Sequence, residues 1–180
     1  TQNRLPNGNI CAKYNILNLK PAVENKVKLE YMQADINDML STFILPRELE
    51  ERLNISDDND KIRLIMWMKE EEEPSQHIAN DLLIKEDLLK NMKLDLIFTN
   101  EFENKDSAIN ELLKKSLYNN IHTNFGEDLQ EAFGRSTFVN HETLPIVALC
   151  KGNRAVYAFS GYQVGSGNLI EKISDLIKEK

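Results

Sequence analysis

The stretch Ile62-Arg63-Leu64-Ile65-Met66-Trp67-Met68 and the turn after it, Lys69-Glu70-Glu71-Glu72-Glu73-Pro74-Ser75-Gln76-His77, decide how this chain folds. The first seven residues are nearly all apolar, which is typical of a central strand buried on both faces. Pro74 suits the first turn of a helix, and the glutamates before it suit the positive end of the helix dipole. The sequence therefore predicts a buried strand, an acidic bend and a helix.

The predicted helix continues to about Lys90, because apolar residues recur on one of its faces. These residues are Ile78, Ala79, Leu82, Leu83 and Leu89. Residues 94–99 form a second apolar run and predict a second buried strand. Two parallel strands joined by a helix normally form a right-handed crossover, so residues 62–99 are expected to make such a unit.

The second half of the chain alternates between helical and strand patterns. Apolar residues at helical spacing predict a helix at Ile109, Leu112, Leu113 and Leu117, a short one at Leu129, Ala132 and Phe133, and a final one at Leu169, Ile170, Ile173, Leu176 and Ile177. Residues 144–150 form a third apolar run. A tight turn at Gly152 then predicts a hairpin whose second strand spans residues 155–160.

The first 45 residues look different from the rest of the chain. Alternating residues predict two antiparallel strands, with residues 40–45 as a shorter third, and the alternation runs through Ile10, Ala12, Tyr14 and Ile16 and then Val27, Leu29 and Tyr31. A short helix is expected at residues 46–53, and the polar residues 56–60 form a turn-prone segment. We therefore divide the chain into a β-rich appendage, residues 1–45, and a main domain, residues 46–180.

Charge and hydropathy exclude several classes of partner. The chain carries 22 basic and 29 acidic residues, a net charge of −7, and its basic residues alternate with acidic ones. Nucleic acids and anionic membrane surfaces are bound by clustered Lys and Arg, so neither partner is expected. No apolar run approaches the roughly 20 residues of a membrane-spanning helix, and no signal-peptide pattern is present. Because the sequence begins at Thr1, we expect a fragment of a longer or processed protein.

The two cysteines, Cys11 and Cys150, share neither a CxxC spacing nor a metal-ligand spacing. Cys150 ends an apolar strand, where a free cysteine acts as a small hydrophobic side chain. Two buried thiols are the expected state. A disulfide between them stays open at this point, because it requires the N-terminal segment to pack beside the strand that carries Cys150.

The order βαβ, helix, ββα over residues 61–180 resembles the thioredoxin-like fold. Met66-Trp67 closes the first strand as an aromatic pair does there, and Thr143-Leu144-Pro145 stands where that family keeps a cis-proline. Gly152 and Gly161 follow at about the family's spacing. The resemblance implies an α/β architecture of three layers, in which a mixed central sheet has helices on both faces and the N-terminal strands form an appendage.

The chain departs from this family at the reactive motif. The family's Cys-Gly-Pro-Cys falls on Glu72-Glu73-Pro74-Ser75, where only the proline matches. A carboxylate or a hydroxyl cannot form a mixed disulfide, so dithiol–disulfide exchange is not expected at this bend.

A narrower resemblance concerns secreted bacterial transglutaminase-like proteins. The segments that carry it are Asn3-Arg4-Leu5-Pro6-Asn7-Gly8, Leu17-Asn18-Leu19-Lys20-Pro21 and Glu73-Pro74-Ser75-Gln76-His77. In those proteins such segments lie between the catalytic domain and the first helix of a thioredoxin-like tail. The resemblance implies an extracellular or periplasmic protein whose Cys-His-Asp machinery lies outside this chain.

The candidate site is a protein-binding face where the acidic bend meets the proline-led strand. Its residues are Glu72, Glu73, Pro74, Ser75, His77, Leu144 and Pro145. Backbone groups beside Pro145 can pair with an added peptide strand, although the geometry can also be inherited with no ligand. Three less favoured interpretations are calcium binding by residues 70–73, a Ser75–His77 nucleophile–base pair, and a metal site shared by His77 and His141.

The expected function is a redox-inert accessory module of a larger secreted transglutaminase-like protein, used for structural support or protein recognition. No catalysis, cofactor or metal is expected. The expected partner is a neighbouring domain of the same polypeptide, or a protein or peptide. Two alternatives stay open: an atypical thioredoxin-fold enzyme that uses the thiol of Cys150, and a calcium-dependent binding module.

Overall fold

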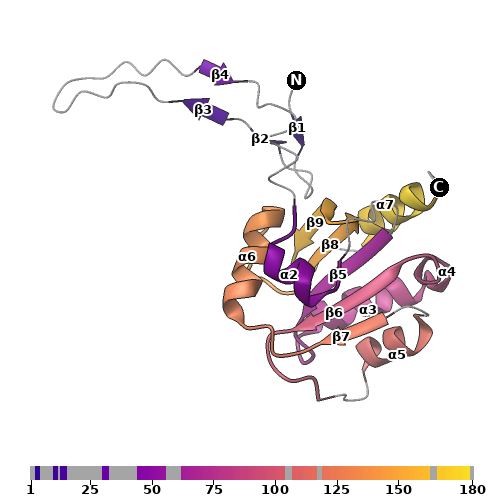
Figure 1. The fold of residues 1–180 in the computed structure, drawn as a ribbon. Coiled ribbons are helices and arrows are strands. Elements are labelled where there is room, and N and C mark those ends of the chain that lie inside the picture. Colours follow the sequence, from indigo (N-terminus) through magenta and orange to yellow (C-terminus); the bar gives the residue numbers. More distant parts are fainter. Residues whose placement is uncertain are drawn as a thin grey trace.

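A five-stranded mixed sheet organises the chain, with strand order β7-β6-β5-β8-β9 (Figure 1). Its central strand is β5 (Ile62–Met68), which is parallel to β6 (Lys93–Phe98) and antiparallel to β8 (Ile146–Lys151). The edges are β7 (Asn119–His122), parallel to β6, and β9 (Arg154–Ser160), antiparallel to β8. The computed structural model describes residues 3–4, 10–11, 13–15, 30–32, 44–55, 62–103, 107–116, 119–162 and 166–178.

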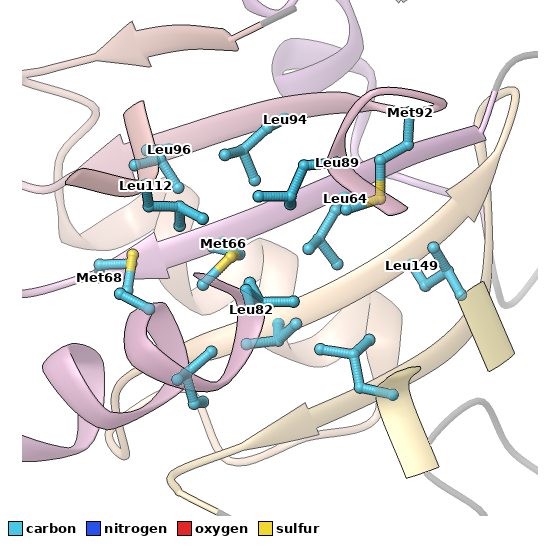
Figure 2. Packing of buried hydrophobic residues seen from close by; sticks show 14 of the residues in the cluster. Leu64, Met66, Met68, Leu82, Leu89, Met92, Leu94, Leu96, Leu112 and Leu149 are labelled. Atoms are coloured by element: carbon cyan, nitrogen blue, oxygen red, sulfur yellow. The ribbon is translucent and has the colours of Figure 1, made fainter. Parts of the chain in front are cut away.

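Every residue of β5 is buried, as its apolar run predicts. Because successive side chains of a strand point to opposite faces, the strand supplies two separate cores. Leu64, Met66 and Met68 belong to one core, part of which Figure 2 shows, whereas Ile65 and Trp67 belong to the other. The position of β5 between β6 and β8 therefore requires helices on both faces of the sheet.

Four helices contribute to the core that contains Leu64. They are α3 (Glu73–Leu83), α4 (Glu86–Leu89), α5 (Ala108–Lys115) and α7 (Gly167–Lys178). The opposite core, which contains Trp67, is covered by α2 (Arg47–Arg52) and α6 (Glu127–Thr137). Helix, sheet and helix thus form three layers, and the fold is the thioredoxin-like α/β fold that the sequence predicts.

The helix expected to run from Pro74 to about Lys90 is in fact two helices. α3 ends at Leu83, and Lys85 has a non-helical backbone, with φ −114° and ψ 44°. Ile84 beside this break is 76% exposed. The apolar periodicity gives no sign of this break, because Leu89 of α4 still packs in the same core as α3. α6 is also longer than the short helix expected around Leu129, since it has 11 residues.

Strand β7, which ends at His122, was not predicted from the sequence. Its sequence is polar, so it lacks the apolar alternation that marks a buried strand. Besides its parallel backbone pairing with β6, polar side chains hold it, because Asn120 and His122 both bond to Asp95 of β6. This edge strand also makes the element order differ from the expected one, because it is inserted between β6 and α6.

The N-terminal segment contains two small antiparallel ladders. β1 (Asn3–Arg4) pairs with β2 (Ile10–Cys11), and β3 (Lys13–Asn15) pairs with β4 (Glu30–Met32). The second ladder bears out the expected pairing of the alternating segments around residues 14 and 31. Residues 40–43 of the expected third strand lie outside the described residues, as does the turn at 56–60. Ile44, which is described, forms an isolated antiparallel bridge with Arg154. The division at residue 46 stays a prediction.

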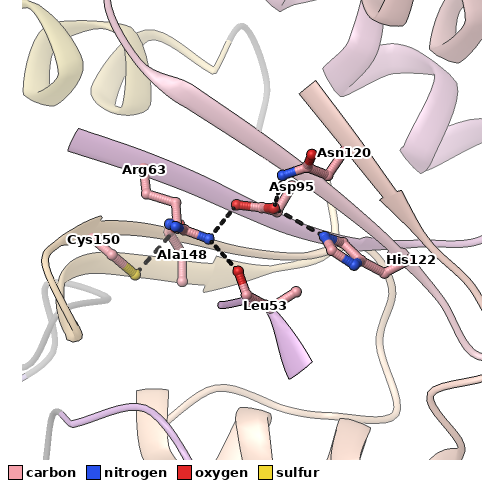
Figure 3. A network of polar contacts seen from close by, with 7 residues as sticks. All are labelled: Leu53, Arg63, Asp95, Asn120, His122, Ala148 and Cys150. Carbon is pink, nitrogen blue, oxygen red and sulfur yellow. Dashed lines mark hydrogen bonds and ion pairs between the residues drawn. The ribbon is translucent and has the colours of Figure 1, made fainter. Parts of the chain in front are cut away.

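A buried ionic network joins β5, β6 and β7 (Figure 3). The carboxylate of Asp95 is completely buried and accepts hydrogen bonds from Arg63 at 2.8 Å and from Asn120 at 2.9 Å, while Nε2 of His122 lies 2.9 Å away. Burial alone raises the pKa of this carboxyl. The hydrogen bonds from His122 and Asn120 and the charge of Arg63 outweigh burial, so the pKa of Asp95 lies below its ordinary value.

Replacing Asp95 by asparagine is expected to lower the free energy of unfolding by about 3–5 kcal/mol, because the guanidinium of Arg63 is left buried without its counter-ion. Urea denaturation at neutral pH measures this loss. Since the pKa of Asp95 is lower in the folded than in the unfolded state, its contribution is lost as the pH falls through the folded-state pKa. The difference between wild type and Asp95→Asn must therefore shrink in acid; a difference that grows contradicts the assignment. Asp87→Asn, which removes an exposed ion pair with Lys90, serves as the control and should change little.

Candidate functional site

The sheet register brings the acidic bend and the proline-led strand to the same end of the molecule. Trp67, next to the last residue of β5, lies opposite Ile146, the first residue of β8. The bend follows β5 directly, and Pro145 precedes β8 directly, so the two segments are neighbours. The Leu144–Pro145 bond is cis, as the resemblance implies, and the carbonyl of Pro145 accepts a hydrogen bond from Gly161 at 2.9 Å.

Ser75 and Gln76 hold the bend in place. The Ser75 side chain is fully buried, and its Oγ accepts a hydrogen bond from the backbone N–H of Lys69 at 3.2 Å. Gln76 donates to the carbonyl of Glu70 and accepts from the backbone N–H of Ala108 at 3.0 Å, which ties the bend to α5. These two residues therefore have a structural use, and Ser75 is not presented to solvent as a nucleophile.

The charged residues of the bend point in different directions. Glu72 pairs with Lys69 at 2.9 Å, whereas Glu73 pairs with His77 at 3.0 Å. The ring of His77 also lies 5.0 Å from that of Tyr162, which is 36% exposed. Ser75 and His77 thus face different partners. Among the described residues, no group of three His, Cys, Asp or Glu side chains is placed to hold a metal ion.

Two hollows meet between the bend and Leu144, and we call them together the groove. The first, of about 240 Å³, is lined by Met68, Lys69, Glu70, Glu71, Phe98, Thr99, Asn100, Glu101, Glu103 and Leu144. The second, of about 480 Å³, is lined by Lys69, Glu72, Thr99, Asn100, Glu127, Asp128, Gln130, Glu131, His141, Glu142 and Leu144. Lys69, Thr99, Asn100 and Leu144 line both hollows, so the hollows are adjacent.

Leu144, which lines both hollows of the groove, has an unused peptide group. Neither its backbone N–H nor its carbonyl is hydrogen-bonded within the part of the chain that the structure describes. The neighbouring peptide groups are engaged, because Thr143 donates to the carbonyl of Asn140 and Pro145 accepts from Gly161. Backbone donors and acceptors are obligatory hydrogen-bonding groups, so a pair left open beside a strand end is a place where an added strand can bind.

The charge of the chain is concentrated around the groove. Nine of the 29 acidic residues line it, but only Lys69 of the 22 basic residues does, so the rest of the chain has 20 acidic and 21 basic residues. Some of these carboxylates are compensated: Glu72 pairs with Lys69, and Glu131 with Arg135. Glu101, Glu127, Asp128 and Glu142 form no ion pair among the described residues, which leaves the groove with a negative potential.

Of the seven residues predicted from the sequence, Glu72 and Leu144 line the groove, whereas Glu73, Pro74, Ser75, His77 and Pro145 do not. Sequence reasoning also missed the third side of the groove. That side consists of Thr99 and Asn100 after β6, and of residues in the first turns of α6. One signal was available, because β5 and β6 are parallel and the residues after parallel strands gather at one edge of the sheet. The contribution of α6 had no sequence signal, since it depends on how the helix packs.

Cys150 lies away from this site. It is fully buried and not in a disulfide, and it stands five residues beyond Pro145 along β8, roughly 16 Å at the rise of an extended strand. Burial raises the pKa of its thiol to about 12, with the charge of Arg63 acting in the opposite direction. At neutral pH the thiol is therefore protonated, and only the thiolate is a nucleophile.

No protein-family model matches the sequence, and the search of curated proteins found no match. Solved structures that are similar in part include three thioredoxin-like or thiol:disulfide proteins. The first is a thioredoxin-like protein in its oxidised form, with 14% sequence identity, a coverage of 70% of this chain and 82% of that chain, and a TM-score of 0.47. The second is a putative thiol:disulfide interchange protein DsbE from Chlorobium tepidum, with 10% identity, a coverage of 67% of this chain and 82% of that chain, and a TM-score of 0.39. The third is the thioredoxin domain of a thiol-disulfide oxidoreductase from Bacteroides vulgatus, with 14% identity, a coverage of 64% of this chain and 81% of that chain, and a TM-score of 0.40. At these values the similarities carry no information about activity, and the fold rests on the sheet topology. Among the described helices, none has the length and apolar content needed to cross a membrane.

Cys150 is expected to resist thiol reagents in the folded protein and to react after unfolding, because its sulfur is buried and protonated. The measurement is labelling of a Cys11→Ser variant, in which Cys150 is the remaining thiol, with and without denaturant. Complete labelling of the native variant within the mixing time would contradict the burial described here.

If Glu72 and Ser75 stand at the positions of the two cysteines of the thioredoxin-like family, a Glu72→Cys/Ser75→Cys variant should form a disulfide on mild oxidation. The two positions are the N-cap and third residue of α3. Mass spectrometry of alkylated samples measures the bond, and Glu73→Cys/Ser75→Cys is the matched control, because residues two apart on a helix do not face each other. Equal disulfide yields in both variants, or none in the first, would refute the equivalence.

Proposed function

We propose that this chain is a redox-inert, non-catalytic recognition module that binds an extended, positively charged peptide segment of a partner protein in the groove. The observation that carries the proposal is the open peptide group of Leu144, which lies between two hollows beside a bend that has no cysteine. A thioredoxin-like scaffold is kept, while the chemistry at its bend is replaced by carboxylates.

Three features of the groove support binding of an extended basic segment. The N–H and carbonyl of Leu144 supply a donor and an acceptor for an added strand, each bond contributing about 0.5–1.5 kcal/mol net. Met68, Phe98 and Leu144 give the first hollow an apolar lining for one side chain of that segment. The carboxylates around the groove attract Lys or Arg side chains, which raises the association rate and selects against acidic segments.

A non-catalytic role is supported by the state of each candidate nucleophile. Ser75 is buried and accepts a backbone hydrogen bond, so its hydroxyl is used in holding the bend. His77 contacts Glu73 and Tyr162 rather than Ser75. The burial and raised pKa of Cys150 argue against the alternative in which its thiol acts as a nucleophile.

We further propose that the chain works as an accessory module of a larger secreted protein of the transglutaminase-like kind, outside the cytoplasm. The support for this context is the resemblance of the N-terminal segments and of Glu73-Pro74-Ser75-Gln76-His77. The basic segment then belongs either to a neighbouring domain of the same polypeptide or to a separate protein.

The test uses a fluorescent decapeptide of alternating Lys and Val, with an alternating Glu and Val peptide as the charge control. Fluorescence anisotropy should show that the basic peptide binds more tightly, and that its affinity falls when the salt is raised from about 20 mM to about 150 mM. A third peptide, the basic sequence with alternate amides N-methylated, should bind weakly because it cannot complete the strand pairing. Equal binding of the basic and acidic peptides, or unaffected binding after N-methylation, refutes the proposal.

Variants locate the site. Glu101→Gln/Glu142→Gln removes two carboxylates from the groove and should weaken binding of the basic peptide severalfold, whereas Glu171→Gln on the exposed side of α7 should not.

Insulin reduction by the wild type should equal the rate without protein, and measurable turnover would overturn the redox-inert assignment. Added calcium should leave the melting temperature unchanged, since a calcium-dependent module would be stabilised by its ion.

A further inference from the structure

A chain of three hydrogen bonds runs from the core to the His141–Leu144 segment, which forms one wall of the groove. Nε1 of Trp67 donates to Oγ1 of Thr99 at 2.9 Å, and Oγ1 of Thr99 donates to Oε1 of Gln130 at 2.7 Å. Nε2 of Gln130 then donates to the carbonyl oxygen of His141 at 2.7 Å. The four residues come from β5, the position just after β6, α6 and the turn before Leu144. We call this chain of hydrogen bonds the relay, and it crosses the whole site.

The direction of this relay follows from the chemistry of its ends. An indole N–H can only donate, so the oxygen of Thr99 must accept from Trp67 and its proton is directed to Gln130. The carbonyl of His141 can only accept, which requires the amide nitrogen of Gln130 on that side. Both ends therefore select the same orientation of the Gln130 amide, and every member of the relay uses a donor or an acceptor that matches its neighbour.

The turn at the end of the relay needs an external anchor. Its other polar contacts are internal: Asn140 bonds to the hydroxyl of Thr143 at 2.9 Å and to the backbone N–H of Glu142 at 3.0 Å, and Thr143 donates to the carbonyl of Asn140. Packing supplies a second contact with α6. A Cβ added to Gly134 would lie 2.6 Å from Cβ of His141, so the turn rests directly on the backbone of the helix.

We infer that Gln130 is the positioning residue of the groove: it holds the His141–Leu144 wall against the strand ends, and through Thr99 it couples that wall to Trp67. The inference rests on the proposed function for its ligand, but the coupling itself is a property of the unliganded protein. Thr99, Gln130 and His141 all line the second hollow. Trp67 is fully buried between Phe125 and Phe133, at ring distances of 6.0 and 6.1 Å, and is the only tryptophan of the chain.

Two consequences follow for the function of the site. First, a peptide bound at Leu144 presses on a wall that is connected to the indole, so binding should change the emission of Trp67. Second, the strength of binding depends on a residue that need not touch the peptide, because Gln130 keeps the open N–H and carbonyl of Leu144 at a fixed distance from the bend. Preorganisation of this kind lowers the ordering cost that binding must otherwise meet.

The test compares Gln130→Met with Ser136→Ala on the same helix. Methionine preserves the volume and helix propensity of glutamine but loses both hydrogen bonds, whereas Ser136 only bonds to the carbonyl of Phe133. Without ligand, Gln130→Met should shift the Trp67 emission to longer wavelength and increase its quenching by acrylamide, and Ser136→Ala should leave both as in the wild type. Unchanged emission and quenching in Gln130→Met overturn the relay.

The same pair of variants is then titrated with the Lys-Val peptide. Gln130→Met should bind about tenfold more weakly while its denaturation midpoint stays close to that of Ser136→Ala, because the lost bonds position a surface wall rather than the core. Equal affinity in the two variants overturns the positioning role. Gly134→Ala pushes His141 and its carbonyl away from α6 while leaving the side chains of the relay unchanged, so it should weaken peptide binding as well. If it does not, the wall is not held where we infer. Failure of the wild type to bind removes the proposed function but leaves the emission comparison decisive for the relay.

Discussion

Pairing of β5 with β6 on one side and with β8 on the other is the constraint on which the rest of the structure depends. Since β5 is buried on both faces, its alternate side chains define two cores and so require three layers. Its antiparallel register with β8 places Ile146 opposite Trp67. That register brings the acidic bend beside Leu144, and these two segments form two sides of the groove.

The same scaffold supports different chemistry because the bend is held by contacts that do not involve thiols. Ser75 caps the backbone of Lys69 from a buried position, and Gln76 ties the bend to α5. The positions that face outward are then free to carry carboxylates. The groove beside the bend is lined by nine acidic residues and one basic residue, so it has a negative potential.

Polar residues in the interior decide details that apolar patterning leaves open. The carboxylate of Asp95 is buried, yet it is satisfied by Arg63, Asn120 and His122, and this network attaches the edge strand β7 to the sheet. A second set of polar contacts, from Trp67 to His141, attaches α6 and the turn before Leu144. In both cases a group that would be costly to bury alone becomes a specific link between elements that are distant in sequence.

The cis-proline was implied by the resemblance to the thioredoxin-like family. By itself the sequence determined the central strand, its partners and most helices, because each of these depends on apolar periodicity, and its residues show that the bend has no dithiol. It did not reveal strand β7, whose residues are polar, or the break at Lys85, which the continuing apolar face concealed. The third wall of the groove, the concentration of charge and the relay through Gln130 were decided only by tertiary structure. They arise where β6, α6 and the turn before Leu144 meet, and side-chain contacts between segments so far apart leave no local pattern to read.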